Sequence, residues 1–375
     1  MKVKGAVTEV TAALQREQGI RYTERRQLPV AAVERLCSSF ARPPFLIEGI
    51  RMSYLSRRFL LPAIVTALVS SSAFAQQEAR PLPEGFQSEL DVPYVKDGDE
   101  AQVLDIFYPT DVNRSRPLLV WIHGGGWRGG SKHGVPWMHQ LTRGYVVASV
   151  EYRFSQKAIF PAQIDDCLAA IRFLRKNAAK YGIDRSRVGV GGSSAGGHLS
   201  ALVGTAGGTG AFKPVGGNPD VFDGVQAVCD IFGPTDFWTV IQQAKDDPNV
   251  KNIFKWNDGD PYSLLIGGGL GKNKDRCTAV SPVTWVSKKT PPFLILHGDH
   301  DTLVPYAQSV ELEARLKEKG VPVVLQKLPG AGHGGPAFNL PAIRRLTDDF
   351  FDKHLQGRDI QVTALPEESV TVPAE

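Results

Sequence analysis

RVGVGGSSAGGH, residues 187–198, is the stretch of sequence that decides the fold. Val188–Gly191 is predicted to be a strand, and a helix is predicted to begin at about Ala195. The residues between them fit the pattern G-x-S-x-G, which places Ser194 on a sharp turn from strand to helix. The glycines that flank Ser194 leave room where side chains would collide, and the helix N-terminus below it favours developing negative charge.

Two other interpretations of this turn stand beside that one. A glycine-rich turn with only a structural role would show the same pattern, so the motif does not decide the function alone. Dinucleotide binding fits less well, because GVGGSSAGG does not satisfy G-x-G-x-x-G in register and no Walker lysine follows.

On both sides of this turn, predicted strands alternate with predicted helices. Unbroken apolar runs at Leu118–His123 and Val146–Tyr152 are typical of strands buried on both faces. Apolar residues at helical spacing predict a helix over Ala162–Tyr181, which Gly182 ends. Further strands are expected at 88–94, 103–108, 225–232, 293–297 and 321–328, and further helices at 304–319 and 342–354. This alternation predicts an α/β fold with a mainly parallel, twisted sheet and helices on both faces.

The 58 residues from Pro234 to Pro291 interrupt the alternation. They are too many for a plain connection between a strand and a helix, and their hydrophobic periodicity is weak. We therefore expect a loop or cap excursion over the carboxyl edge of the sheet, after the strand that ends near Phe232.

A second motif lies 71 residues before Ser194, where His123-Gly124-Gly125-Gly126-Trp127 ends a predicted buried strand. Its glycines expose backbone N–H groups that can converge on an oxyanion, and the Ala195 N–H is a further donor. A plain tight turn is the alternative for this motif taken alone. His123 is expected to shape the loop rather than to act as a base.

A serine hydroxyl needs a base to become a nucleophile, and the base needs an orienting carboxylate. His333 lies in GAGHGG after the last predicted strand, and a glycine-flanked histidine in an exposed loop is difficult to explain as core packing. Asp299 and Asp301 follow the strand 293–297. His198, on the helix after Ser194, is expected to pack against the sheet.

Four segments, in this order along the chain, resemble the α/β-hydrolase carboxylesterases, close to their hormone-sensitive-lipase-like and BD-FAE (feruloyl-esterase-like) branches. They are HGGGW, VGGSSAGGHLSA, SPVTWV with PPFLILHGDHDTLVPYAQS, and LPGAGHG, and the resemblance covers about residues 88–355. It implies an α/β-hydrolase fold with Ser194 as nucleophile, Asp301 as the orienting acid and His333 as the base. It also implies oxyanion donors at Gly125, Gly126 and Ala195.

The resemblance leaves some assignments open. Asp299 is the second choice for the acid and Asp236 the third, because some hydrolases place the acid after the preceding strand. The segments PAQIDD and FGPTD also look family-like, and we expect them to brace loops.

By this resemblance the chain is expected to be a serine carboxylic-ester hydrolase that works through an acyl-enzyme and needs no cofactor. The substrate is expected to be an acylated carbohydrate, feruloyl or acetyl, or a short-chain ester. Aromatic residues in or beside the excursion could stack on such a substrate, although packing is the commoner role; they are Phe237, Trp238, Phe254, Trp256 and Tyr262. A serine exopeptidase, an arylformamidase-type amide hydrolase and a non-catalytic binding module on a hydrolase scaffold are the alternatives.

The residues around Met52 have the pattern of an export signal. Two arginines precede the apolar run Phe59–Val69, and Ala73-Phe74-Ala75 forms a cleavage site. A signal peptide is therefore expected at 52–75, cut after Ala75, for a periplasmic or secreted protein. Eleven apolar residues are too few for the roughly 20 that span a bilayer, so no membrane anchor is expected.

Residues 1–51 are expected to be a mistaken N-terminal extension, with a genuine N-terminal region as the alternative, and residues 76–375 a single domain. The whole chain has a net charge of +4. Residues 1–75 hold 11 of the 43 Lys and Arg but only 5 of the 39 Asp and Glu, so the remainder has a net charge of −2. No nucleic-acid surface is therefore expected.

Cysteines and histidines give no sign of a metal site. There is no C-x-x-C, His297 lies on a predicted strand, and no distant third ligand accompanies it and His300. Cys167 is expected to be buried in a helix. In an oxidising compartment one disulfide is possible, and Cys229 with Cys277 is the pair we consider.

Overall fold

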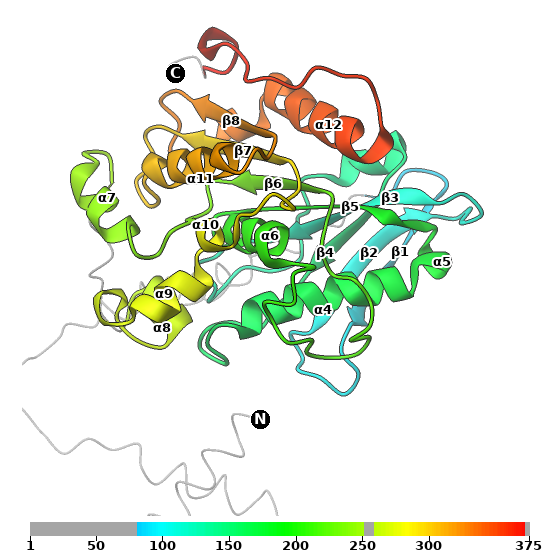
Figure 1. The fold of residues 1–375 in the computed structure, drawn as a ribbon. Helices are drawn as coiled ribbons and strands as arrows, with labels where there is room; N and C mark the ends of the chain where they lie inside the picture. Colours follow the sequence, from blue (N-terminus) through cyan, green and yellow to red (C-terminus); the bar gives the residue numbers. More distant parts are fainter. Residues whose placement is uncertain (1–80, 251–258, 372–375) are drawn as a thin grey trace, which may run out of the picture. The chain divides into compact units, whose positions relative to one another are not determined.

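The computed structural model describes residues 81–250 and 259–371, and its centre is one sheet of eight strands (Figure 1). The strand order is β1-β2-β4-β3-β5-β6-β7-β8. β1 pairs with β2, and β2 with β4, in antiparallel fashion, and all the other neighbours are parallel. The strands are β1 (Phe86–Pro93), β2 (Val103–Pro109), β3 (Arg116–Ile122), β4 (Val146–Val150), β5 (Ile183–Ser193), β6 (Ala227–Ile231), β7 (Phe293–Gly298) and β8 (Val323–Leu328). The predicted mainly parallel α/β sheet is confirmed.

Helices cover both faces of this sheet, as the alternation predicts. One face packs against α4 (Ala162–Lys176), α6 (Ala195–Ala206) and α11 (Tyr306–Glu318). The other packs against α12 (Pro341–Gln356) and the short 3₁₀ helix η3 (Met138–Arg143). The helix expected over 162–181 is in fact two, because α4 ends at Lys176 and α5 (Ala178–Tyr181) follows.

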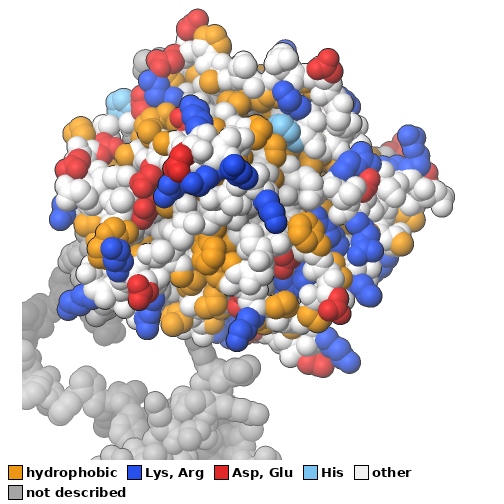
Figure 2. Space-filling view, in the orientation of Figure 1, with side chains coloured by type: hydrophobic (Ala, Val, Ile, Leu, Met, Phe, Trp, Pro, Cys, Tyr) orange, Lys and Arg blue, Asp and Glu red, His pale blue; other side chains and the backbone are white. Residues whose placement is uncertain are grey.

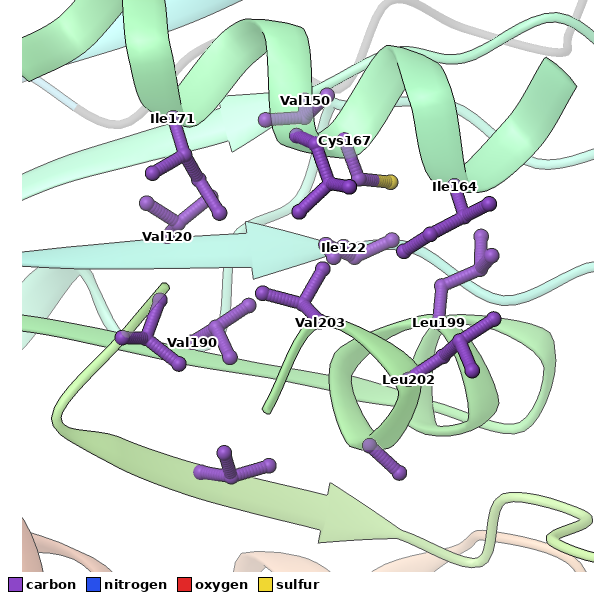
Figure 3. Packing of buried hydrophobic residues seen from close by; sticks show 14 of the residues in the cluster. Val120, Ile122, Val150, Ile164, Cys167, Ile171, Val190, Leu199, Leu202 and Val203 are labelled. Carbon is purple, nitrogen blue, oxygen red and sulfur yellow. The ribbon is translucent and has the colours of Figure 1, made fainter. Parts of the chain in front are cut away.

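Strand side chains alternate between these two layers, and each layer has its own core. Figure 3 shows the α4 and α6 side, where apolar side chains of both helices meet those of the central strands. The labelled residues there are Val120, Ile122, Val150, Ile164, Cys167, Ile171, Val190, Leu199, Leu202 and Val203. Burial of this kind stabilises a fold by roughly 25 cal/mol per Å² of apolar surface.

The excursion after β6 consists of short helices. They are α7 (Val240–Asp246), α8 (Pro261–Ile266), η4 (Leu270–Lys272), α9 (Lys274–Val280) and α10 (Pro282–Trp285). Helices of three to seven residues are too short to show a hydrophobic period, which explains the weak periodicity of this segment. Of the aromatic residues considered for substrate stacking, Phe237 and Tyr262 are buried and Trp238 is 44% exposed. Phe254 and Trp256 lie outside the described residues, as do the expected extension 1–51 and the expected signal peptide 52–75.

The disulfide considered between Cys229 and Cys277 is wrong. Both thiols are free and buried, as is that of Cys167. Cys229, on β6, belongs to the α12 side of the sheet, whereas Cys277, on α9, belongs to the opposite core. The sheet therefore separates the two sulfur atoms.

The described residues include no helix that is both long enough and apolar enough to cross a membrane. Acidic and basic side chains are both spread over the face of the molecule in Figure 2, among apolar and polar groups.

Strand β5 carries glycines on its α12 face because large side chains from elsewhere lie on it. The indole of Trp137 covers Gly191 and makes edge contacts with the rings of Trp121 and Phe351, each at 5.0 Å between centroids. A Cβ atom on Gly191 would lie 2.3 Å from Cη2 of Trp137 and 2.6 Å from the carbonyl oxygen of Cys229. Neither the indole nor the backbone of β6 has room to retreat.

We therefore predict that Gly191→Ala lowers the free energy of unfolding by about 1–3 kcal/mol, through overpacking. Urea unfolding of the purified protein measures this. Gly271→Ala is the matched control, because a Cβ atom there meets nothing within 4 Å. Equal stability of the two variants would contradict this account of the α12 core.

Candidate active site

Ser194 sits on a strained turn between β5 and α6, as the motif predicts. Its backbone has φ 56° and ψ −121°, which is rare for any residue other than glycine. The chain can turn here only because the residues two positions before and after Ser194, Gly192 and Gly196, lack side chains. A Cβ atom on Gly192 would lie 2.2 Å, and one on Gly196 2.0 Å, from the carbonyl oxygen of Ile122 at the end of β3. The backbone N–H of Ser194 donates to the carbonyl of Ile231 at 2.8 Å.

The three side chains that the resemblance groups together meet at the carboxyl ends of the strands. The hydroxyl of Ser194 lies 2.9 Å from Nε2 of His333, in position to donate a hydrogen bond. Nδ1 of His333 lies 2.6 Å from Oδ2 of Asp301, in position to donate in turn. These residues come from the β5–α6 turn, the loop after β8 and the loop after β7, 139 and 32 residues apart.

The carboxylate of Asp301 is buried and well supplied with donors. Its Oδ1 accepts from the backbone N–H groups of Leu303 and Val304, and its Oδ2 also lies 3.2 Å from Nε2 of His297. Burial alone would raise its pKa. The hydrogen bonds from His297 and His333 outweigh that effect and hold the pKa of Asp301 well below its usual range. The carboxylate is therefore ionised at neutral pH and keeps the His333 ring oriented.

The other two candidate acids do not reach His333. Asp299 accepts hydrogen bonds from the backbone of Gly330 and from the exposed His300 ring. Asp236 accepts from the backbone N–H groups of Trp238 and Thr239, at the start of the excursion. Of the three aspartates weighed from the sequence, only Asp301 is brought to the histidine.

The glycine loop lies beside this trio with free donors. Gly125 and Gly126 have positive φ angles of 112° and 61°. Within the residues that the structure describes, the backbone N–H groups of Gly125, Gly126 and Ala195 donate to no protein acceptor. Such a cluster of unpaired N–H groups next to a nucleophile can stabilise an oxyanion.

One clamp ties this loop to the helix that follows Ser194. The indole Nε1–H of Trp127 donates to Nδ1 of His198 at 3.1 Å, and Nε2 of His198 lies 2.8 Å from the carbonyl of Val280. Burial lowers the pKa of His198 to about 4, so the ring is neutral and its Nδ1 can accept. His198 was expected to pack against the sheet; the structure also gives it this bridging role.

A second clamp, which no sequence motif indicates, holds both ends of the loop. The carboxylate of Glu151, just after β4, bonds Nε2 of His123 and the backbone N–H of Lys132, both at 3.0 Å. Burial opposes its ionisation, but the hydrogen bonds from His123 and Lys132 hold the pKa of Glu151 below its ordinary value. The hydroxyl of Tyr152 donates to the carbonyl of His123, and their rings stack at 4.5 Å. His123 thus shapes the loop, as expected.

The segment PAQIDD also braces loops. Asp166 bonds the guanidinium of Arg153 and the amide of Gln102, and Gln163 donates to the carbonyls of Arg153 and Ala158. In FGPTD, the backbone N–H groups of Thr235 and Asp236 donate to Gln308 on α11. No group of three or more His, Cys, Asp or Glu side chains among the described residues could hold a metal ion.

Comparison with known proteins gives the same picture at the level of family. The BD-FAE family model matches residues 104–316, from β2 to α11 and across Ser194 and Asp301. Esterase LipQ of Mycobacterium tuberculosis is 31% identical over 261 residues, which are 68% of this chain and 58% of LipQ. Carboxylesterase NlhH of the same species is 38% identical over 144 residues, 38% of this chain and 43% of NlhH. This chain therefore spans less than three fifths of the length of these curated relatives.

Two solved structures are also similar. A truncated carbohydrate esterase from gut microbiota has a TM-score of 0.64 and 31% identity, over 74% of this chain and 99% of its own. A bifunctional GH43-CE protein of Bacteroides eggerthii has a TM-score of 0.63 and 33% identity, over 71% of this chain and 38% of its own. Since the family model covers more than half of the chain, the chain belongs to the BD-FAE family of α/β-hydrolase carboxylesterases.

Proposed function

We propose that the protein hydrolyses carboxylic esters through a covalent acyl-enzyme on Ser194. The observation that carries this proposal is the unbroken chain of hydrogen bonds from the Ser194 hydroxyl through His333 to Asp301. A serine hydroxyl is a poor nucleophile until a neighbouring base removes its proton. The free N–H groups of the glycine loop supply the second requirement, a site for the oxyanion.

In the first half of the reaction, His333 takes the Ser194 proton while Oγ forms a bond to the ester carbonyl carbon. The negative charge that develops on the carbonyl oxygen is held by the N–H groups of Gly125, Gly126 and Ala195. Protonated His333, stabilised by Asp301, then gives its proton to the departing alcohol oxygen as the ester C–O bond breaks. In the second half, water loses a proton to His333 as its oxygen forms a bond to the acyl carbon. The bond between that carbon and Oγ of Ser194 then breaks, the carboxylic acid departs, and Oγ takes the proton back from His333.

For the substrate, we infer an acylated carbohydrate, carrying feruloyl or acetyl groups, or a short-chain ester. The similarity to two carbohydrate esterases supports the first, and the similarity to a carboxylesterase supports the second. The relatives that match about two thirds of this chain are esterases, which favours an ester substrate over the amide of the alternatives. A binding module without activity would not need the Ser194–His333–Asp301 alignment or the free donors beside it.

Removing the nucleophile tests the mechanism. We expect Ser194→Ala to lower kcat on p-nitrophenyl acetate by about 10⁶-fold and to abolish labelling by a fluorophosphonate probe. Wild-type protein that neither reacts with the probe nor turns over any ester would favour the binding module.

Removing the acid tests the choice among the aspartates. We expect Asp301→Asn to lower kcat by about 10⁴-fold, because the histidine loses its orientation and the stabilisation of its positive charge. Asp299→Asn is the matched control, two residues away, and should keep nearly full activity. A greater loss in Asp299→Asn than in Asp301→Asn would overturn the assignment.

The second clamp makes Glu151 a positioning residue for the oxyanion loop. We expect Glu151→Ala to lower kcat by about 10- to 100-fold with KM little changed, because misplaced donors cost most when charge develops. Glu89→Ala is the control, since Glu89 also binds a lysine and two tyrosines but on β1. A rise in KM with kcat unchanged would show that Glu151 acts on substrate binding instead.

We further propose that the protein is exported, on the strength of the signal pattern around Met52. The protein recovered from the periplasm or medium of an expressing bacterium should begin at Gln76. N-terminal sequencing and intact mass measure this, and full-length protein retained in the cytoplasm would refute it.

A further inference from the structure

A pocket of about 310 Å³ lies on the α12 side of the sheet, opposite α4 and α6. Ser193 and Gly334, the chain neighbours of Ser194 and His333, line it, although Ser194 and His333 themselves do not. Its floor is formed by strand ends, among them Trp121 of β3 and Ser193, the residue before the nucleophile. Trp137 and α12 form its far wall. We call this space the α12 pocket. Its volume lies at the lower end of the roughly 300–1,000 Å³ typical of small-molecule sites. Of the excursion aromatics considered from the sequence, the three that the structure describes, Phe237, Trp238 and Tyr262, do not line it.

Residues next to His333, the proposed base, form part of the rim of the α12 pocket. Gly334 and Gly335, directly after His333, line it. So does Phe232, whose ring lies 4.6 Å from that of His333 and 4.7 Å from that of Phe338 between centroids. Phe232 adopts a φ of 45°, which a bulky side chain seldom does. Such strain persists only where the surroundings impose it, and it commonly marks a functional site.

This placement decides which part of an ester the pocket would receive. The departing alcohol oxygen must lie within hydrogen-bond reach of His333, because it takes a proton from that ring. The pocket reaches the surroundings of His333 through Phe232 and Gly334, whereas the oxyanion donors are not among its lining residues. Gly126 instead faces α8, where a Cβ atom would lie 3.4 Å from Pro261. The alcohol portion therefore extends into the α12 pocket, and the acyl portion extends away from it.

The lining of the pocket indicates the kind of alcohol. Aromatic rings suit the C–H faces of a sugar ring, and the pocket has four: Trp121, Trp137, Phe232 and Phe338. A pocket for the alkyl chain of a simple alcohol would need apolar side chains alone, whereas polar side chains also line this one. Arg344 and Asn339 stand exposed at the mouth, and neither side chain has a hydrogen-bond or ion-pair partner among the described residues. Deeper in, Asp348 is held by His139 and Gln140.

We propose that the α12 pocket is the leaving-group subsite and that it binds a pyranose ring whose hydroxyl carries the ester, with Arg344 and Asn339 bonding the other hydroxyls. This inference rests on the proposed esterase function and deepens it. It predicts the reverse transfer as well. A sugar bound there can replace water, lose its hydroxyl proton to His333 and take the acyl group, which leaves Ser194 with its proton restored.

Two substrates with the same acyl group and different alcohols test the subsite. Acetylated methyl xyloside and p-nitrophenyl acetate both form the acetyl-enzyme, so any difference between them arises from the alcohol. We expect Arg344→Ala combined with Asn339→Ala to lower kcat/KM for the sugar ester by at least about tenfold, because charged and neutral hydrogen bonds are both lost. The value for p-nitrophenyl acetate should change less than about threefold, since a nitrophenolate makes no such bonds and leaves without a proton.

Arg345→Ala is the matched control, because Arg345 is the exposed neighbour of Arg344 on α12 and does not line the pocket. This control variant should have the same kcat/KM as the wild type for both substrates. Methyl xyloside added to the p-nitrophenyl acetate reaction should yield acetylated xyloside with the wild type and much less with the double variant.

Three results would overturn the inference. One is equal kcat/KM of the double variant and Arg345→Ala on the sugar ester. Another is a changed preference of the double variant among p-nitrophenyl esters of different acyl length, which would make the pocket an acyl site. The third is wild-type turnover of p-nitrophenyl acetate without any turnover of the sugar ester. In all three the esterase function stands, whereas inactivity on every ester would refute that function too.

Discussion

The contact on which the site depends is between backbones, where the β5–α6 turn presses against the end of β3. Cβ atoms on Gly192 and Gly196 would lie within 2.2 Å of the Ile122 carbonyl, so no other residue fits at either position. This closeness forces Ser194 into its rare backbone conformation. It also brings the start of α6, with the free N–H of Ala195, against the strand that leads directly into the glycine loop. Ser194 and the free N–H groups beside it are thus positioned by one steric constraint.

Polar clamps then stop the loop from moving away from that turn. Trp127 and His198 join it to α6, and Glu151 ties its two ends to the strand β4. A loop rich in glycine loses much conformational entropy when it is ordered, so it needs such fixed partners. Under the proposed mechanism, N–H groups that are held in place before the substrate binds need little reorganisation when negative charge develops.

Much of this arrangement can be predicted from sequence, and what cannot has identifiable causes. The buried strands and the G-x-S-x-G turn are local patterns, so the parallel sheet and the place of Ser194 follow from them. His333 is visible because glycines surround it in a loop. Glu151 shows no such signal: it is one acidic residue after a strand, and its role appears only when residues 123 and 132 fold back onto it.

Other features depend on what the fold brings together from distant places. The α12 pocket combines residues from four strands, α12 and two short 3₁₀ helices, so no single segment of the sequence indicates it. The aromatic residues of the excursion are close together in sequence and therefore suggest a substrate site. Two of them, Phe237 and Tyr262, are instead buried in the core. The predicted Cys229–Cys277 disulfide is wrong for the same reason, because the sequence does not show on which face of the sheet each thiol lies.

The carboxylate of Asp301 connects chemistry with the integrity of the fold. Besides the bond from His333, it accepts hydrogen bonds from the backbone of Leu303 and Val304 and lies 3.2 Å from the buried ring of His297. The negative charge therefore helps to stabilise the fold. Its pKa in the folded protein lies below the value of about 3.9 that an unfolded chain would give it. Ionised Asp301 therefore stabilises the folded state in full above that value, and this contribution fades as acid titrates the group towards its folded pKa. One proton added to this carboxylate would therefore weaken both its bond to the His333 ring and its hold on the neighbouring backbone.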